Sequence, residues 1–530
     1  MRTPERESLF YEGLWIAAIV LQLTVIWGAP LFPSTDGPVH LYYVEVIRNL
    51  LDGTGPYPAF YNLRNPLPPY LFQYAATLTL EKLFAPLVAE QVLLSLYSVW
   101  FAISTRYLAR SLGAGWRVAS LVAVGFTLHR LVYMGFFNFC LAVPTALFLI
   151  GLWTKCAERL TLRRGVAFSL GFLVLATMHP VPLAFLLGYI GVHTVLSFIH
   201  SYRNAREHQM KQALNRCAGV LLPILLSLPV VVWVLVVSRG STQSPIWQQA
   251  FFSRIFSLPG LWPILPMTAG WYRHAASGAF AVIVCLTAFS LVKKWRPDDF
   301  LNTKGAVILS ACGLLLLYAV VPTEINGNGF FETRFVIFGF LLVTMAMALV
   351  QLLPSIERIA IVCAAGLVLL LVAPFWRINA QLSRDIEPIL SATTVPEGST
   401  GAVIADRCDI TDPPIADIQF FPYLHTGVHF FRRSKAVLVG TPWTSVPMNP
   451  VSHKEEYSWN ELPYCQTIPA IREWVSAAPN RRLDFLLVLT RRAEVPPAAI
   501  ALGEEMGLKH VVALSERFVL LAVEPVTHRK

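Results

Sequence analysis

Residues 13–45, GLWIAAIVLQLTVIWGAPLFPSTDGPVHLYYVE, join a long apolar stretch to a short polar one, and this junction decides the fold class. Residues 13–31 are long and apolar enough to cross a bilayer as a helix. They are too long for the apolar core of a signal peptide and lack a small-residue cleavage site, so we expect a retained first span. Asp36 and His40 follow at the membrane boundary, where ionisable side chains are costly unless they have a use. We therefore take this pair as the core of a candidate active site.

The composition indicates a polytopic membrane protein. The chain has 530 residues, of which 55% are hydrophobic and only 14% charged, and its mean hydropathy is +0.56. A chain of this kind is too apolar to be a soluble protein. Twelve apolar segments occur near residues 13–31, 68–85, 87–109, 117–133, 136–154, 165–180, 182–199, 217–238, 276–292, 305–321, 335–353 and 358–375.

The basic charge belongs to the membrane part of the chain. Residues 1–376 carry 26 Lys and Arg against 15 Asp and Glu, whereas residues 377–530 carry 16 against 17. The basic residues are distributed between apolar spans and form no continuous stripe, as the positive-inside bias of membrane proteins predicts. This pattern argues against a nucleic-acid partner.

The segment 68–85 decides the topology. It opens with two prolines and contains Glu81 beside Lys82, which is compatible with a juxtamembrane or re-entrant helix; an ordinary spanning helix with a tolerated ion pair is the alternative. If it does not cross, about eleven crossings remain, the N-terminus is cytoplasmic, and most loop Lys and Arg fall inside. The Asp36 loop and the C-terminal region then both lie outside the cytoplasm. The predicted outer loops are residues 33–66, 239–275 and 322–334.

Residues 377–530 are expected to form a soluble extracytoplasmic α/β domain, and residues 1–376 the transmembrane domain. Short apolar runs predict strands at 401–406, 436–440, 483–489 and 518–523, with helices at 467–477 and 495–506. Cys408 and Cys465 are the only cysteines of this region. A disulfide between them would suit an oxidising compartment, but spacing alone does not establish the pairing.

The chain resembles the GT-C superfamily of membrane glycosyltransferases. The resemblance rests on an acid-bearing loop after the first span (Asp36), a Pro-Pro-Tyr-Leu helix (Pro68–Leu71), an arginine heading a late span (Arg334) and a soluble tail. It implies transfer of a hexose or pentose from a polyprenyl-phosphate carrier, on the outer face, to a lipid, glycan or protein acceptor in cell-envelope glycan biosynthesis.

The first loop departs from the pattern of many GT-C relatives, which carry two adjacent acids or an acid-x-acid motif there. In this chain Asp36 is followed by glycine, and the next acid is Glu45. One carboxylate and one histidine make a poor site for a divalent cation, which prefers several oxygen ligands. We therefore expect no cofactor and do not favour a metal.

Asp36 is our candidate for the catalytic base that accepts the proton of the acceptor hydroxyl, and His40 would orient Asp36 or contact the phosphate. The alternative for Asp36 is a helix N-cap, because Asp-Gly-Pro is good capping sequence. Arg334 is the candidate for the carrier phosphate, which guanidinium binds bidentately. An arginine that only reaches to lipid headgroups is the alternative for Arg334.

Other polar residues on the predicted outer side are candidate substrate-lining residues. Glu324 and Glu332 flank an Asn- and Gly-rich loop that would contact sugar hydroxyls or form only a turn. Arg254 and Arg273 lie in the aromatic loop 239–275, which would cover a lipid-carrier groove or form only an interfacial belt. The remaining candidates are His129, Arg130, Asn138 and His179.

Three classes of function follow from this sequence. The first is a membrane glycosyltransferase with Asp36 as base. The second is a non-catalytic GT-C-like subunit of an envelope polysaccharide or lipid assembly system, which the missing second acid favours. The third is a lipid or glycan transporter, which would carry ionisable residues at mid-span; few are present here.

Overall fold

The computed structural model describes residues 4–64, 70–156, 161–203, 225, 228–229, 232–233, 251–261, 263–265, 271–324, 329–391, 394–405, 425–439, 449–454, 468–476, 483–489, 495–514 and 518–523. The chain divides into two compact units. The helical unit comprises Met1–Ile26, Leu94–Val132 and Phe136–Trp376. The mixed unit comprises Trp27–Leu93, Tyr133–Gly135 and Arg377–Lys530.

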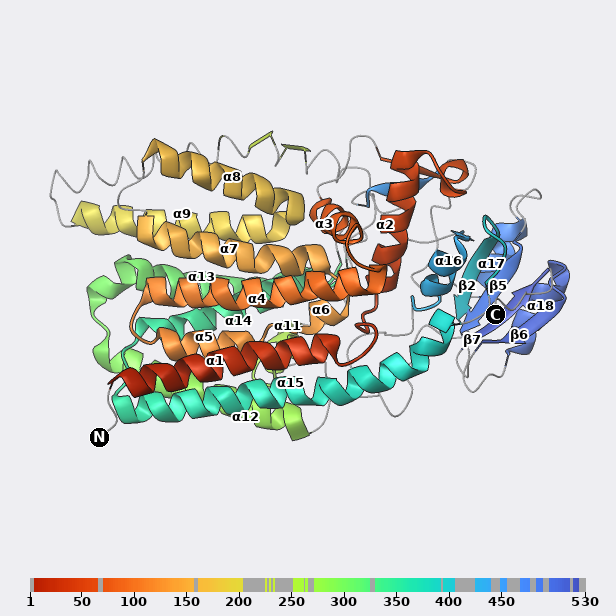
Figure 1. The fold of residues 1–530 in the computed structure, drawn as a ribbon. Helices are drawn as coiled ribbons and strands as arrows, with labels where there is room; N and C mark the ends of the chain where they lie inside the picture. Colours follow the sequence, from red (N-terminus) through yellow and green to blue (C-terminus); the bar gives the residue numbers. More distant parts are fainter. Residues whose placement is uncertain are drawn as a thin grey trace. The chain divides into compact units, whose positions relative to one another are not determined.

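The helical unit is a bundle of long helices whose axes run nearly parallel in Figure 1. Its longer helices are α1 (Pro4–Trp27), α4 (Pro86–Leu112), α7 (Phe137–Cys156), α8 (Leu162–Met178), α9 (Pro180–Arg203), α12 (Trp271–Lys294), α13 (Thr303–Val320), α14 (Phe331–Ala346) and α15 (Pro354–Ser391). Shorter elements are α5 (Trp116–Gly125), α6 (Arg130–Tyr133), α11 (Phe251–Ser257), η3 (Pro297–Leu301) and η4 (Met347–Leu349). Within the bundle, α13 packs against α14 and α9, and α7 against α9.

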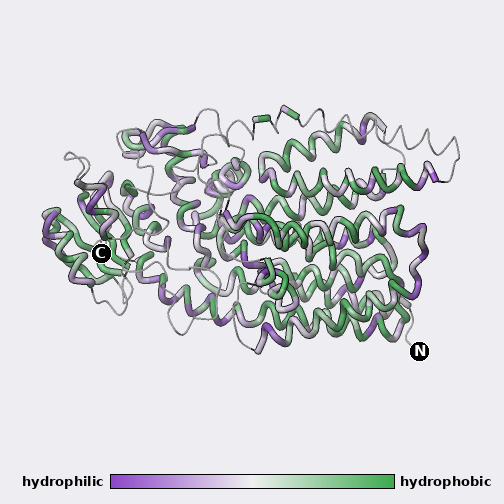
Figure 2. The backbone as a smooth tube through the Cα atoms, turned by 180° about the vertical axis from the view of Figure 1, so that it is seen from behind, coloured by the Kyte–Doolittle hydropathy of each residue, from purple (hydrophilic) through white to green (hydrophobic). Residues whose placement is uncertain are grey.

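Eight helical segments in the described part of the chain are long and apolar enough to cross a membrane. They are Leu9–Trp27, Pro86–Leu112, Phe137–Cys156, Pro180–Arg203, Trp271–Lys294, Thr303–Val320, Phe331–Leu349 and Pro354–Ser391. Figure 2 shows these helices as mainly hydrophobic along their length, with hydrophilic residues toward their ends and in the connections. The prediction of a multi-pass membrane protein is confirmed.

The other predicted apolar segments have different outcomes. Helix α8 has 17 residues, still within the range that crosses a bilayer. The segment predicted at 117–133 is divided into α5 and α6 by a turn, in which the Thr127 N–H donates to the Val124 carbonyl (3.1 Å). The segment predicted at 68–85 contains α3 (Phe72–Leu80), whose nine residues span only about 14 Å and cannot cross. The segment 217–238 lies almost wholly outside the described residues, as do Cys408 and Cys465.

The mixed unit holds a five-stranded sheet in the order β3-β2-β5-β7-β6. The strands are β2 (Thr400–Ala405), β3 (Val437–Leu438), β5 (Phe485–Leu489), β6 (His510–Ala513) and β7 (Phe518–Ala522). Strand β2 pairs in parallel with β3 and β5, and the other pairs are antiparallel. Helices α16 (Val428–Ser434), α17 (Ile468–Ser476) and α18 (Pro497–Glu505) pack beside these strands. The predicted C-terminal α/β fold is confirmed.

The first loop belongs to the same compact unit as the C-terminal region. We predicted a domain boundary between residues 376 and 377, and the contact division also changes there, within α15. The mixed unit additionally contains α2 (Gly37–Asp52), η1 (Tyr57–Ala59), β1 (Tyr61–Leu63) and α3. Strand β1 pairs antiparallel with β4 (Val451–His453), so residues 61–63 and 451–453 form a small second sheet. The first loop is thus part of the same compact unit as the C-terminal region.

Candidate functional site

Asp36 lies at the N-cap position of α2, but its side chain does not cap the helix. Its backbone has φ −100° and ψ −10°, and the carboxyl makes no capping hydrogen bond. The Gly37 N–H instead donates to the Ser34 hydroxyl (3.2 Å), and Pro38 starts the helix with its fixed φ. Helix α2 ends at Gly53, whose φ of +63° terminates the helix in the left-handed conformation. The buried Asp36 carboxyl, only 3% exposed, is therefore left for another role.

A three-residue strap, Tyr133–Gly135, fixes the backbone of Asp36. The Thr35 N–H donates to the Tyr133 carbonyl (2.9 Å) and the Asp36 N–H to the Met134 carbonyl (3.3 Å). Gly135 has φ +86°, and a Cβ built there would lie 2.7 Å from Asp36 Cβ and 2.9 Å from Asp36 N. Only glycine satisfies both the conformation and the close approach. The strap thus determines where the carboxyl stands.

His40, one turn after Asp36, is held by two hydrogen bonds within the mixed unit. Its Nε2 lies 3.1 Å from the Gly135 carbonyl and its Nδ1 lies 3.0 Å from the Tyr74 hydroxyl. A carbonyl only accepts, so Nε2 carries the proton and Nδ1 accepts from Tyr74 in the neutral ring. Burial lowers the pKa of His40 to about 4, against the opposing effect of the Gly135 carbonyl, so the ring is neutral at physiological pH. Both ring nitrogens are engaged, which argues against the predicted contact with a phosphate.

Asp36 faces a histidine from the C-terminal region. The Nε2 atom of His425 lies 3.7 Å from Asp36 Oδ1, within ion-pair range but too far for a hydrogen bond. Burial lowers the pKa of His425 to about 3, with a further lowering by His40, and burial raises the pKa of Asp36 well above its usual value. When the two side chains hold one titrating proton between them, that proton is therefore on Asp36 and the His425 imidazole is neutral. These contacts define the Asp36 site: Asp36, His40, Tyr74, Gly135 and His425.

A second buried carboxyl, Glu90 of α4, packs against the residue after Asp36. A Cβ built on Gly37 would lie 2.5 Å from Glu90 Oε1, and Glu90 is 4% exposed. Arg432 of α16 lies within electrostatic reach of both Glu90 and Glu45. Within the described residues, no group of three or more His, Cys, Asp or Glu side chains has the arrangement of a metal site.

Tyrosines of α2 and β1 connect the Asp36 site to the edge of the sheet. The Leu438 N–H donates to the Tyr42 hydroxyl (2.9 Å), which itself donates to the Ala436 carbonyl (3.2 Å). The Tyr61 hydroxyl donates to the Leu438 carbonyl (2.5 Å), and its ring stacks on His453 with centroids 4.5 Å apart. These buried bonds position α2, and with it Asp36, on the C-terminal sheet.

The helical unit contains a separate group of charges, Arg130, Arg254 and Glu332, and a further buried arginine, Arg334, in the same turn of α14 as Glu332. We call these four residues the arginine cluster. Arg254 is 1% exposed and closes the C-terminal end of α13. Its guanidinium donates to the carbonyls of Tyr318 (3.0 Å) and Val321 and to the Thr323 hydroxyl (2.8 Å). A cation at this end of a helix neutralises its free carbonyls, so Arg254 has a structural role.

Arg334 lies in the first turn of α14 and is 4% exposed. Its guanidinium stands 5.3 Å from the ring centroid of Phe136, and its charge also acts on Cys140 and His179. Such burial argues against an arginine that merely reaches to lipid headgroups, because that role places the guanidinium in the solvated interface.

Arg130 and Glu332 complete the cluster. The Arg130 guanidinium stands 4.8 Å from the Phe330 ring, and its backbone N–H donates to the Ile264 carbonyl (2.7 Å). Glu332, 9% exposed, lies within electrostatic reach of Arg254 and Arg130. Three guanidinium groups and one carboxylate leave the cluster with a net positive charge, which suits an anionic ligand.

The remaining predicted lining residues occupy varied places in the helical unit. His179 lies between α8 and α9, where its Nδ1 accepts from the Val181 N–H (3.1 Å), and His129 is buried beside the Tyr97 hydroxyl (3.5 Å). Asn138 is buried at the start of α7. Arg273, in the first turn of α12, and Glu324 are both half-buried.

Sequence reasoning missed four residues of the Asp36 neighbourhood: Tyr74, Glu90, Gly135 and His425. Glu90 lies within the apolar segment 87–109, where no neighbouring polar motif marks it. His425 precedes His429 by four residues in a region predicted to share the outer side with Asp36, and this was an available signal. Nothing local marks Gly135 or Tyr74, because their roles come from contacts distant in sequence.

Solved structures share the fold over nearly the whole chain. The apo crystal structure of ArnT from Cupriavidus metallidurans matches with a TM-score of 0.56 and 12% identity, covering 98% of each chain. A second ArnT structure, bound to undecaprenyl phosphate, gives a TM-score of 0.49 and 13% identity over 98% of this chain and 99% of that one.

The cryo-EM structure of the arabinofuranosyltransferase AftD from Mycobacteria gives a TM-score of 0.52 at 14% identity, covering 97% of this chain but 40% of AftD. No protein-family model and no curated protein sequence matches the chain. At such low identities the likeness concerns the fold. Together with the membrane helices and the C-terminal sheet, it shows that the chain shares the fold of ArnT and AftD.

Proposed function

We propose that this protein is a glycosyltransferase that moves a sugar from a polyprenyl-phosphate carrier to a hydroxyl of a lipid, glycan or protein acceptor, with Asp36 as the base. The observation that carries the proposal is the buried, uncapped Asp36 carboxyl, fixed by the Tyr133–Gly135 strap in a GT-C fold. A carboxyl that only capped α2 would bond to the first helical N–H groups, and this one does not.

The proposed reaction is a direct displacement at the anomeric carbon. The acceptor oxygen attacks this carbon while its proton passes to the Asp36 carboxylate, and the bond to the carrier phosphate breaks with its electrons left on the phosphate. A base is most effective when its pKa lies near the working pH, and burial moves the pKa of Asp36 in that direction. No metal is required in this scheme.

His425 acts in this proposal as a positioning residue. A neutral imidazole whose Nε2 carries a proton would donate to the carboxylate once Asp36 ionises, and the 3.7 Å separation would then shorten. His40, fixed by Tyr74 and Gly135, supports the turn that follows Asp36. Both histidines thereby hold the carboxyl without taking the proton themselves.

Arg334 is our candidate for the phosphate of the carrier. Guanidinium stays charged in apolar surroundings and matches phosphate oxygens with two parallel hydrogen bonds. The net positive charge of the arginine cluster would stabilise the charge that develops on the leaving phosphate. Arg130 and Glu332 would orient the Arg334 side chain or its ligand, while Arg254 holds the end of α13.

The test is sugar transfer in proteoliposomes, with the full-length chain and a panel of polyprenyl-phosphate-linked hexoses and pentoses. We expect Asp36→Asn to lower the transfer rate by about 10²–10⁴-fold, the usual contribution of a general base. Asp52→Asn is the matched control, because Asp52 is an exposed acid at the far end of the same helix. Unchanged transfer by a folded Asp36→Asn protein would remove Asp36 as the base.

The missing second acid of the first loop favours one alternative, a non-catalytic GT-C-like subunit of an envelope assembly system. Such a subunit would transfer no sugar from any donor of the panel. It would still support glycan assembly in cells when it carries Asp36→Asn. Donor turnover by the wild-type chain alone excludes this alternative.

A further inference from the structure

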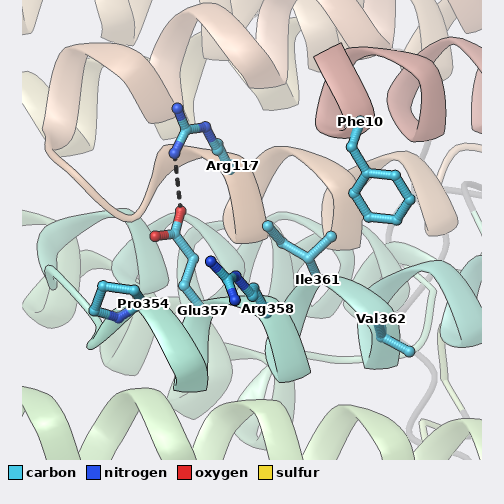
Figure 3. A pocket seen from close by; sticks show the side chains of 7 residues that line it. All are labelled: Phe10, Arg117, Pro354, Glu357, Arg358, Ile361 and Val362. Carbon is cyan, nitrogen blue, oxygen red and sulfur yellow. Dashed lines mark hydrogen bonds and ion pairs between the residues drawn. The ribbon is translucent and has the colours of Figure 1, made fainter. Parts of the chain in front are cut away.

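Two ion pairs, one in each unit, show how direct contact satisfies a charged side chain. Arg472 and Glu505 of the mixed unit approach to 2.8 Å. In the helical unit, Arg117 and Glu357 approach to 3.4 Å beside a cavity of about 250 Å³ lined by α1, α5 and α15 (Figure 3). Arg432 of α16 differs, because its Nε atom is buried and has no hydrogen-bond partner among the described residues. A buried donor without a partner calls for an explanation.

Two carboxylates of the mixed unit act on the charge of Arg432. Glu45 lies on α2, and Glu90 lies near the start of α4. Burial lowers the pKa of Arg432, and both carboxylates oppose this effect. Glu90 is buried, and its Oε1 atom also has no hydrogen-bond partner in the described part of the chain. Opposite charges thus attract one another where solvent screens them little.

The other neighbours of Arg432 leave this attraction in place. Burial lowers the pKa of His429 to about 3 and raises the pKa of Tyr57, so both side chains are neutral at physiological pH. The remaining charged neighbours of Arg432 and Glu45 pair among themselves, Arg48 with Glu81 and Lys435 with Glu397. Arg432 is therefore the cation that Glu45 and Glu90 share.

The backbone of α16 and the turn before it connect Arg432 to His425. The Val428 N–H donates to the His425 carbonyl (3.0 Å), and this turn continues directly into α16. Helix α16 also packs against α2, the helix that follows Asp36. A displacement of α16 would therefore change the 3.7 Å separation between His425 Nε2 and Asp36 Oδ1.

We propose that Arg432 is a positioning residue for the proposed transfer and keeps His425 facing the Asp36 carboxyl. It acts through its attraction to Glu45 and Glu90, which holds α16 in place. The inference rests on the proposed role of Asp36 as the base. Glu45 belongs to α2, and a Cβ on the first residue of that helix would lie 2.5 Å from Glu90 Oε1. Both carboxylates therefore belong to, or contact, the helix that Asp36 precedes.

The alternative is that Arg432 only stabilises the C-terminal end of α16, where cations interact favourably with free carbonyls. Arg433 occupies the same last turn but is exposed. Arg433→Gln is therefore the matched control, because it removes a cation from this helix end and leaves the buried one in place.

The experiment measures sugar transfer by the full-length chain in proteoliposomes, as a function of donor concentration and pH. Arg432→Gln should lower kcat by about tenfold or more and leave KM for the donor unchanged, since a displaced group slows the reaction without removing a substrate contact. It should also move the acidic limb of kcat/KM to higher pH, because a displaced His425 donates less well to the Asp36 carboxylate. Arg432→Lys, which retains the charge, should recover part of both losses, and Arg433→Gln should behave like the wild type.

Combined variants show whether Arg432 acts through His425. His425→Leu together with Arg432→Gln should have the acidic limb of His425→Leu alone, because the side chain that Arg432 positions is already absent. Glu90→Gln should shift the limb in the same direction, and adding it to Arg432→Gln should cause no further loss, since the two groups act as one unit. Thermal unfolding identifies the variants that fold. If Arg432→Gln does not fold, Arg432→Lys and Glu90→Gln carry the same test.

Three results would overturn the proposal. One is a folded Arg432→Gln protein with the kcat and the acidic limb of the wild type, and another is an equal loss in Arg433→Gln. The third is a further shift of the limb when Arg432→Gln is added to His425→Leu. The base is judged separately: an active Asp36→Asn protein removes the proposed function, whereas an inactive Asp36→Asn beside a fully active Arg432→Gln removes only the role of Arg432.

Discussion

The surroundings of the Asp36 carboxyl argue against a helix cap and favour the proposed role as a base. The first N–H of the helix, that of Gly37, donates to the Ser34 hydroxyl, and the Asp36 side chain is buried beside His425. Burial raises the pKa of Asp36, so the carboxyl holds a proton at a pH where an exposed aspartate would have lost it. In the proposed reaction the ionised form of Asp36 acts as the base, so transfer should increase with pH.

The pH profile of transfer tests this assignment and the role of His425. We expect kcat/KM to fall on the acidic side with an apparent pKa above the usual aspartate value of about 4. His425→Leu removes a donor to the Asp36 carboxylate and should move the acidic limb to higher pH. His425→Gln retains an N–H donor, so its acidic limb should lie between those of His425→Leu and the wild type. An acidic limb that is the same in all three proteins would contradict a positioning role.

Gly135 is the residue whose replacement should be least tolerated near the site. Gly135→Ala forces a Cβ to 2.7 Å from Asp36 Cβ and into a left-handed conformation, so Asp36 must move. We expect about 1–3 kcal/mol of lost stability and at least a tenfold loss of transfer. Thermal unfolding and transfer rates measure the two effects.

Gly53→Ala distinguishes the effect of backbone strain from the effect of the steric clash between a Cβ at position 135 and Asp36. Gly53 has φ +63°, but a Cβ there meets no atom within 4 Å, and it lies at the far end of α2. This control should lose stability and keep the transfer rate. Equal transfer rates in the Gly135 and Gly53 variants would show that the strap does not position Asp36.

Helix α2 depends on contacts from the C-terminal sheet. Nearly every residue between Gly37 and Ile47 is buried, so burial does not single out one face of the helix. Its orientation is set by hydroxyl groups, because Tyr42 both accepts from and donates to the 436–438 segment. A buried N–H that loses its acceptor destabilises a fold more than a lost apolar contact of similar size. The tyrosine hydroxyls thus make the position of α2 specific.

Tyr42→Phe leaves the Leu438 N–H without this acceptor, and we expect a loss of about 1–3 kcal/mol in the free energy of unfolding. Tyr57→Phe is the matched control: Tyr57 is also fully buried, but its hydroxyl has no hydrogen-bond partner in the described part of the chain. The control should be neutral or slightly stabilising. Equal effects of the two changes in thermal unfolding would refute the docking role of Tyr42.

At the scale of helices and strands, the sequence predicted individual elements better than the turns and pairings that relate them. Apolar runs correctly marked β2, β5 and β7, because buried strands are nearly continuous in hydrophobic residues. Hydropathy predicted one span at 117–133. The turn after α5 consists of apolar residues and small polar ones, so the mean hydropathy of this stretch does not distinguish it from a continuous helix. The pairing of Tyr61 with His453 was not predictable, because periodicity within a strand carries no information about its partner.

At the scale of the whole molecule, the mixed unit contains four histidines whose pKa values are lowered by burial. The pKa values of His40, His425, His429 and His453 are lowered to between about 3 and 4, chiefly by burial. Each ring is neutral in the fold but would accept a proton near pH 6.5 in the unfolded chain. Between these pH values the unfolded chain binds more protons at each site, so each histidine lowers stability as the pH falls.

His429 allows this linkage to be measured away from Asp36. Between pH 6.5 and 5, its share of the lost stability should be about 2 kcal/mol, and His429→Leu should remove that share. Unfolding measured at several pH values should therefore show a shallower pH dependence in the variant. Phe430→Leu, a neighbouring buried change without a titrating group, should keep the wild-type slope; a parallel slope for His429→Leu would contradict the linkage.

The candidate site was predictable only in part at the molecular scale. The first-loop position of Asp36 is visible in the sequence, because a carboxyl directly after an apolar span stands out against its surroundings. Its partners are separated from it by about 100 residues for Gly135 and almost 400 for His425, and neither belongs to a local motif. Composition and spacing describe the chain locally, whereas these contacts exist only after folding.

The hydrogen bond between Tyr42 and Leu438 joins residues 396 positions apart, and this separation has a consequence for biosynthesis. At about 5–20 residues per second, α2 leaves the ribosome on the order of 20–80 seconds before its partner is made. During that time Asp36 has neither His425 nor the sheet edge that holds its helix. A chain interrupted before residue 425 would insert its helices yet lack the partner of its proposed base, so competence for transfer would be acquired late in synthesis.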